Sequence, residues 1–287
     1  MATTVTGLAA AGATGVATPR HYLRCLGGIV WRELLRFVHQ RGRFLAALVR
    51  PLVWLFIFAA GFRSVLGVSI QPPYVTYVLY EVYITPGLCG MILLFSGMQG
   101  SLSMVYDREM GSMRVLLVTP LPRWYLLTCK LFAGVLVAVL QVYVFLLIAW
   151  FWGIEAPPVG YVAVLPALLV AGFMLGALGL LLSSVIRQLE NFAGVMNFII
   201  FPMFFASSAL YPLWRIRESS VLLWQIASAN PFTHAVELIR VALYGQLDVV
   251  SLAATVGCAI LFFGLAVLGY NPARGFMARK GAGGGGE

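Results

Sequence analysis

The sequence predicts an all-α integral membrane protein with six transmembrane helices and an amphipathic helix before the first of them. Three observations lead to this fold class: the composition, six long apolar stretches, and the uneven placement of the basic residues. Of the 287 residues, 61% are hydrophobic and only 10% are charged, and the mean hydropathy is +0.93. A soluble domain carries about 25% charged residues. A bilayer accepts so apolar an exterior, because the lipid tails around it are themselves apolar.

Six apolar stretches are long enough to cross the hydrocarbon core, which takes about 20 helical residues. The predicted spans cover about residues 44–68, 82–105, 131–152, 159–186, 192–210 and 249–270. Together they form one transmembrane domain, residues 20–273. We expect the leader, residues 1–19, to be disordered, because it is rich in Ala, Thr and Gly and lacks the basic and apolar regions of a signal peptide. The Gly-rich tail, residues 274–287, is also expected to be disordered.

The basic residues gather on one side of these spans. Of the 19 lysines and arginines, 15 lie before the first span, between the second and third, after the fourth, or after the sixth. The positive-inside rule therefore places both termini in the cytoplasm. The same distribution explains the net charge of +9 without a nucleic-acid partner. Arg215, Arg217 and Arg240 break the rule, because they lie between the fifth and sixth spans and should face outside.

The segment Tyr22–Gln40 has the pattern of an amphipathic helix. Apolar residues recur at steps of three and four, at Leu23, Leu26, Val30, Leu34 and Phe37. Arginines occupy other positions around the helix. This pattern predicts a helix lying in the inner membrane interface. A soluble helix packed on a partner protein is the alternative.

Few polar residues occur within the spans, and no pattern of a catalytic, cofactor or metal site is present. Gln99, Gln141 and Asn197 could line a translocation path, or they could make hydrogen bonds between helices. The Gly172 and Gly176 pair forms a GxxxG motif, which we interpret as helix packing. The sequence contains no GxxxxGK[ST] loop, so the chain is not expected to bind ATP through one.

The loop Tyr106–Lys130 between the second and third spans has a pattern of its own. Asp107 and Glu109 suit the start of a helix, where the dipole favours acidic groups. A short apolar face follows, and Pro120 and Pro122 stop the helix. Its apolar residues are Met113, Leu116 and Leu117. Such a rigid element suits docking on a soluble partner, although an interfacial turn would have the same pattern.

This loop resembles that of type-2 ATP-binding-cassette (ABC) exporter permeases, which reads roughly E-R-E-x-G-[ST]-h-x-x-L-L-x-T-P, followed by a basic residue and a later Lys. The matching residues are Arg108, Glu109, Gly111, Ser112, Leu116, Leu117, Thr119, Pro120, Arg123 and Lys130. Asp107 stands where Glu is common, and Arg114 belongs to the same loop. The segment before the last span also resembles the family, at Ser207, Ser208, Pro212, Asn230, Pro231, Arg240 and Gly245. The resemblance extends from about Tyr22 to Tyr270.

The resemblance implies a role for each of these segments. The helix before the first span would be the interface helix, and the loop Tyr106–Pro120 would be the coupling helix. That helix would dock on a separate ATPase subunit, which would hold the ATP and Mg, so the chain itself would be neither an enzyme nor a cofactor-binding protein. The segment after Leu210 would form short re-entrant helices at the outer mouth, because Pro212 and Pro231 interrupt it.

The function expected from the resemblance is that of a permease subunit of an ATP-driven exporter in a bacterial inner membrane. Two permease chains, identical or related, would form the path for an amphiphile such as a drug, a lipid-linked sugar or a polysaccharide. A secondary transporter is the first alternative, but we detect neither intramembrane carboxylates nor inverted repeats. A membrane enzyme or assembly factor is the second, but no titratable groups converge near a membrane face.

Overall fold

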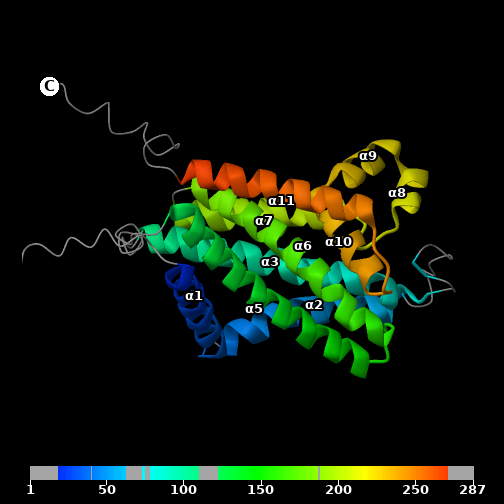
Figure 1. Ribbon diagram of the computed structural model, residues 1–287. Coiled ribbons are helices and arrows are strands. Elements are labelled where there is room, and N and C mark those ends of the chain that lie inside the picture. Colours follow the sequence, from blue (N-terminus) through cyan, green and yellow to red (C-terminus); the bar gives the residue numbers. More distant parts are fainter. Residues whose placement is uncertain are drawn as a thin grey trace, which may run out of the picture.

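The computed structural model describes residues 19–39, 41–62, 73–74, 78–109, 122–186 and 188–270, and most of them are helical. The helices, labelled in Figure 1, are α1 (Pro19–His39), α2 (Arg41–Phe62), α3 (Tyr80–Glu109), α5 (Arg123–Phe151), α6 (Pro158–Val185), α7 (Leu189–Phe205), α8 (Leu213–Ser219), α9 (Val221–Ala229), α10 (Pro231–Ala242) and α11 (Val249–Gly269). The predicted tail, and the predicted leader apart from Pro19, lie outside the described residues.

Four helices in the described chain, α3, α5, α6 and α11, are long and apolar enough to cross a membrane. The helices α2 and α7 carry shorter apolar segments, Leu48–Ile57 and Leu189–Phe205. The all-helical membrane fold is therefore confirmed, whereas the count of six spans stays a prediction. The short helices α8, α9 and α10 lie where the proline-interrupted segment was expected to form short helices.

Several predicted boundaries differ from the observed ones. The fifth span was expected to reach residue 210, but α7 ends at Phe205. The Ser207 hydroxyl donates to the carbonyl of Phe204 at 2.6 Å and accepts from the amide of Ala209 at 3.2 Å, which turns the chain. The helix α5 begins at Arg123, not near residue 131, because a proline at position 122 can directly precede a helix. Lys130 therefore belongs to a helix and not to a loop.

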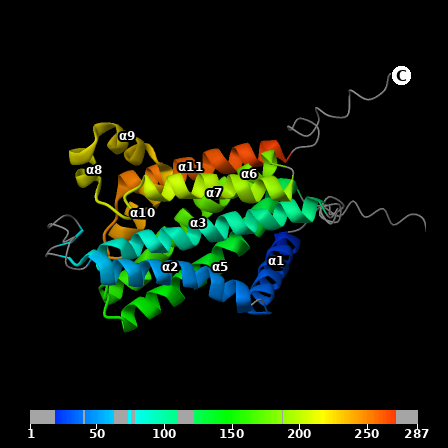
Figure 2. The ribbon, with the colours of Figure 1, turned by 180° about the vertical axis from the view of Figure 1, so that it is seen from behind.

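The helix α6 lies at the centre of the bundle. It packs most extensively against α3 and α11, and also against α5 and α10. Figure 2 shows the bundle from behind, with α7 and α11 on one side of α3 and with α2 and α5 on the other. The helix α7 packs mainly against α3, which leaves much of its surface exposed.

Glycines allow α3 and α6 to approach closely. A Cβ at Gly97 would lie 3.0 Å from the Cα of Gly176, and a Cβ at Gly179 would lie 2.9 Å from the carbonyl oxygen of Gly97. A Cβ at Gly172 would meet Val135 of α5 at 3.0 Å. The interpretation of the GxxxG pair as helix packing is therefore confirmed.

The two ends of the bundle are built differently. Figure 1 shows α1 beside the start of α5, at the end where α3 and α11 also finish. The Tyr125 hydroxyl of α5 donates to the carbonyl of Tyr22 at 2.6 Å, and the two rings meet edge to face at 4.8 Å. The expected helix before the first span is thus confirmed. The helices α8, α9 and α10 lie at the opposite end.

The close approach of α3 to α6 makes Gly179 a sensitive position. We expect Gly179→Leu to destabilise the protein by about 1–3 kcal/mol, because the larger side chain must push α3 away from α6. Gly257→Leu on α11 is the matched control, since a Cβ there meets nothing within 4 Å. Thermal unfolding of both variants in detergent measures the difference. Equal midpoints would show that the two helices do not depend on this contact.

Candidate functional site

Arg240 of α10 is the most deeply buried charged residue of the junction at the α8–α10 end of the bundle. Its side chain is 3% exposed and forms an ion pair with Glu237, one turn earlier on the same helix. Its Nη2 donates to the carbonyl of Ser208 at 2.8 Å, and its guanidinium lies 4.1 Å from the centroid of the Tyr83 ring. The charge is thus paired, hydrogen-bonded and stacked, as a buried cation requires. These contacts connect α10 to α3 and to the turn after α7.

Tyrosines complete this junction. The Tyr83 hydroxyl donates to the carbonyl of Ser208 at 3.0 Å, and the Tyr80 hydroxyl donates to the carbonyl of Leu210 at 2.8 Å. The first turn of α3 therefore satisfies two buried carbonyls of the irregular chain after α7. The ring of Tyr74 packs edge to face on Tyr244 at 5.0 Å.

Burial shifts the pKa of two further tyrosines at this junction. Burial raises the pKa of the Tyr74 hydroxyl, and the nearby Arg240 guanidinium opposes part of that rise. Burial also raises the pKa of the Tyr244 hydroxyl. A tyrosine is already neutral at physiological pH, and burial makes ionisation of these two side chains less favourable still.

Asn230 connects the end of α7 to the start of α10. Its Nδ2 donates to the carbonyls of Met203 and Ala206 at 2.8 and 2.7 Å. Its Oδ1 accepts from the amide of Phe232 at 2.9 Å and caps α10. One side chain thus satisfies backbone groups at the ends of two helices, which explains why an asparagine occupies this position.

The other predicted residues of this segment shape the chain. Pro212 occupies the N-cap position of α8 without a capping hydrogen bond. Pro231 occupies the first position of α10, where its missing N–H costs no hydrogen bond. Gly245 has a φ of 70° and lets the chain turn after α10. The structure therefore brings Asn230, Pro231 and Arg240 together on or next to α10, and it places Pro212 and Gly245 at turns.

The three polar residues predicted for a pathway do not form one group. Gln141 of α5 is buried, and its Oε1 accepts a hydrogen bond from the Ser96 hydroxyl of α3 at 2.5 Å. This hydrogen bond joins α3 to α5. It is the alternative, expected from the sequence, to a role of Gln141 in lining a translocation path. Gln99 lines a small pocket with Ser96 and with Arg50 of α2. Asn197 is exposed on α7. Gln99 and Gln141 thus flank the same serine, whereas Asn197 lies apart.

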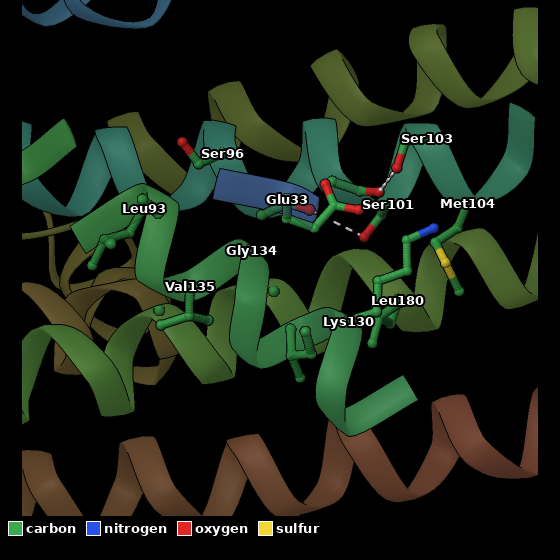
Figure 3. Close-up of a pocket in the computed structure, with 16 residues that line it drawn as sticks. Glu33, Leu93, Ser96, Ser101, Ser103, Met104, Lys130, Gly134, Val135 and Leu180 are labelled. Atoms are coloured by element: carbon green, nitrogen blue, oxygen red, sulfur yellow. Dashed lines mark hydrogen bonds between the residues drawn. The ribbon is translucent and has the colours of Figure 1, made fainter. Parts of the chain in front are cut away.

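A cavity of about 70 Å³ lies where α1, α3, α5 and α6 meet. Figure 3 shows Glu33 of α1 and Lys130 of α5 reaching it from two helices, with the hydroxyls of Ser101 and Ser103 contributed by α3. Ser96 lines the same cavity. Two charged side chains and three serines therefore reach a small space whose remaining lining is apolar side chains and glycines. No group of three His, Cys, Asp or Glu side chains in the described chain is placed to hold a metal ion.

Most of the predicted coupling loop lies outside the described residues: Gly111, Ser112, Arg114, Leu116, Leu117, Thr119 and Pro120. Asp107, Arg108 and Glu109 form the last turn of α3. The interpretation of Asp107 and Glu109 as a helix start is therefore wrong. No helix breaker follows the second span before Gly111, so the helix continues through the charged residues.

Sequence reasoning missed several residues of the junction around Arg240. The Glu237 and Arg240 pair has the i, i+3 spacing of a helical ion pair and could have been found from that spacing. The roles of Tyr80 and Tyr83 could not have been found from the sequence, because their partners lie more than 120 residues away along the chain.

Arg240 allows a direct test of what this junction contributes. We expect Arg240→Ala to lower the free energy of unfolding by about 3–5 kcal/mol, because it removes a buried, hydrogen-bonded charge pair. Arg215→Ala is the matched control: Arg215 also pairs with a glutamate three residues away, but its side chain is 61% exposed. That pair should contribute less than about 1 kcal/mol. Chemical unfolding in detergent followed by circular dichroism measures both, and similar losses would refute the structural role of Arg240.

Comparison with known proteins agrees with this helical architecture. The family profile described as ABC-2 type transporter matches residues 25–244. The chain is 27% identical over 223 residues to the transport permease ycf38 of Cyanophora paradoxa, which covers 74% of this chain and 71% of that protein. It is 29% identical over 164 residues to YbhR of Escherichia coli, named as a multidrug ABC transporter permease, covering 56% of this chain and 43% of YbhR. It is also 29% identical over 100 residues to Nodulation protein J of Rhizobium leguminosarum, and this match covers 33% of this chain and 38% of that protein.

The family match covers well over half of the chain and includes α2, α3, α5, α6 and α7. It also includes the junction around Arg240 and the residues of the predicted coupling loop. The chain therefore belongs to the ABC-2 type transporter family, and it is a multi-pass, non-catalytic membrane permease subunit.

Proposed function

We propose that this chain is the membrane-spanning half of an exporter that a separate ATPase subunit drives, and that it moves an amphiphile out of the cytoplasm. The observation that carries this proposal is the gathering of α1, the end of α3 and the start of α5 at one end of the bundle. Those two helix ends flank residues 110–121, which contain most of the motif that resembles a coupling helix. An ATPase docked there would contact the part of the chain best able to transmit movement.

The proposed orientation puts this end in the cytoplasm of a bacterial cell, with α2 and α7 completing six spans of the plasma membrane. The support is the concentration of basic residues, 15 of 19, in segments that this orientation places inside. Both termini would then be cytoplasmic. The helices α8, α9 and α10 would lie at the outer face as short re-entrant elements.

The proposed mechanism is mechanical. Closure of two ATPase subunits on ATP would displace the coupling loop, and with it the adjoining ends of α3 and α5. The cavity beside Glu33 and Lys130 supports this idea, because helices that meet around a space can shift with fewer lost contacts than helices in a filled core. At the other end, the junction around Arg240 would limit the shift. ATP would act by favouring one of two packings.

The proposed substrate is an amphiphile, carried between two permease chains. Gln99 and Asn197 remain the proposed lining residues, because the buried Gln141 is already bonded to Ser96. The exposed Asn197 on α7 is available to a second chain. The name of the relative YbhR, a multidrug permease, supports an apolar or amphiphilic substrate class. No cofactor is proposed on this chain, since ATP and Mg would bind the partner ATPase.

The proposed orientation predicts a labelling pattern. Cysteines introduced at Pro72 and Pro157 should react in intact cells with a maleimide that cannot cross the membrane. A cysteine at Arg114 should react only after the cells are opened. The wild-type protein measures the background from its four native cysteines. Reaction of Arg114→Cys in sealed cells would reverse the orientation.

The proposed coupling loop predicts that Glu109→Ala and Gly111→Leu abolish ATP-driven transport while leaving membrane insertion intact. Removing a carboxylate from a desolvated contact costs about 2–5 kcal/mol, largely because its partner is left unpaired. A leucine at a glycine in a close contact adds a steric clash. Uptake of an amphiphilic dye into inverted vesicles, together with co-purification of the ATPase, measures the effect.

Two control substitutions accompany these variants. Glu155→Ala removes an exposed acid at the opposite end of the bundle, and Gly257→Leu adds a leucine where a Cβ has open space. Both should transport normally. Normal transport by the Glu109 and Gly111 variants at normal expression would refute the proposal that this loop couples the chain to the ATPase.

A further inference from the structure

The helices α8 and α9 form a hairpin that stands apart from the bundle. The two helices pack mainly against each other, and α9 makes only minor contact with α10. Figure 2 shows the hairpin beside the start of α11, at the end of the molecule where α7 finishes. Because α11 is a membrane-spanning helix and α7 an apolar one, the hairpin lies close to the level at which the chain leaves the hydrocarbon core.

The surface of α9 is apolar and uncovered. Val221, Leu222, Leu223 and Ile226 are each between 49% and 67% exposed, and Ala227 is the buried residue of this helix. A helix that is apolar around most of its circumference is normally buried in protein or in lipid. Left in water, this much contiguous apolar surface would be costly. Something outside the single chain therefore covers α9.

Two arginines border this apolar surface, each beside a tryptophan. The guanidinium of Arg215 lies 5.3 Å from the ring centroid of Trp214, and that of Arg217 lies 5.1 Å from that of Trp224. Arg215 also pairs with Glu218 at 3.3 Å, with both side chains 61% exposed. Tryptophan with arginine at an apolar boundary is typical of protein segments at the headgroup level of a bilayer.

We propose that the α8–α9 hairpin is a lipid-binding surface that recognises anionic phospholipid headgroups. The apolar side chains of α9 enter the outer part of the acyl region, the tryptophans lie at the level of the glycerol groups, and Arg215 and Arg217 bind phosphates. This accounts for two of the three arginines that break the positive-inside rule. The third, Arg240, is buried at the junction already described.

A second copy of the chain is the competing occupant, and the size and charge of the hairpin argue against α9 as the centre of such a contact. A helix of nine residues is about 13 Å long. A stable protein interface buries about 800 Å² on each partner, more than this helix alone can offer, so the contact between permease chains proposed above would rest mainly on other surface such as α7. A symmetric contact would also bring the arginines of the two hairpins close together. The lipid proposal depends only on membrane insertion, so it stands whichever ATPase or substrate is found.

The test uses the full-length protein in phosphatidylcholine vesicles that contain a minor fraction of phosphatidylglycerol. Bromine is placed on the acyl chains of one lipid or the other, and it quenches the fluorescence of nearby tryptophans. The difference between the wild type and Trp214→Phe/Trp224→Phe isolates the hairpin signal. We expect brominated phosphatidylglycerol to quench this signal more than brominated phosphatidylcholine does at the same mole fraction. The local enrichment should be up to about fivefold for each arginine.

Charge variants complete the test. In Arg215→Gln/Arg217→Gln the preference for phosphatidylglycerol should disappear while quenching by both lipids remains, because α9 is still apolar. Arg215→Lys/Arg217→Lys is the matched control and should keep most of the preference. Equal quenching by the two lipids in the wild type would overturn the proposal, and so would absence of quenching. Disulfide formation between two chains of Leu222→Cys, with no quenching, would assign the surface to a second copy instead.

Discussion

The helices α3 and α6 approach so closely that a Cβ at Gly97 or Gly179 would collide with the backbone of the facing helix or with atoms beside it. The rest of the bundle is arranged around this pair, since α5, α10 and α11 all pack on α6 while α2 and α7 pack on α3. Lipid tails are as apolar as leucine, so the hydrophobic effect does little to hold helices together in a bilayer. Close backbone contact supplies the dispersion energy in its place.

Burial inside the protein makes a similar demand on the irregular chain after α7. Backbone groups freed where α7 ends cannot bond to solvent, so side chains must satisfy them. Asn230, Tyr80, Tyr83 and Arg240 do so, and their partners are the carbonyls between Met203 and Leu210. The glycines of α3 and α6 allow two helices to pack closely. The polar side chains of the junction around Arg240 allow the chain to leave helical geometry while staying buried.

The two ends of the molecule have different physical characters. One end is connected by many specific hydrogen bonds around α10. At the other, α1 meets the long helices around a cavity lined by Glu33, Lys130 and serine hydroxyls. This difference agrees with the proposal that movement of the subunit begins at the end where α1 lies.

Composition, length and periodicity alone determined the membrane class, four of the six predicted spans, the helix before the first span and the proline-broken segment, because these depend on local sequence and on the thickness of the bilayer. The resemblance in the loops led to the correct family. Only the tertiary structure decided that Gln141 makes a hydrogen bond to Ser96, that Asn197 is exposed, and that Tyr80 and Tyr83 reach across the bundle. It also placed Asp107 and Glu109 within α3, where the start of a helix was expected. Contacts between residues 45 to 130 positions apart leave no periodic pattern in a single sequence, so they appear only when the helices are packed.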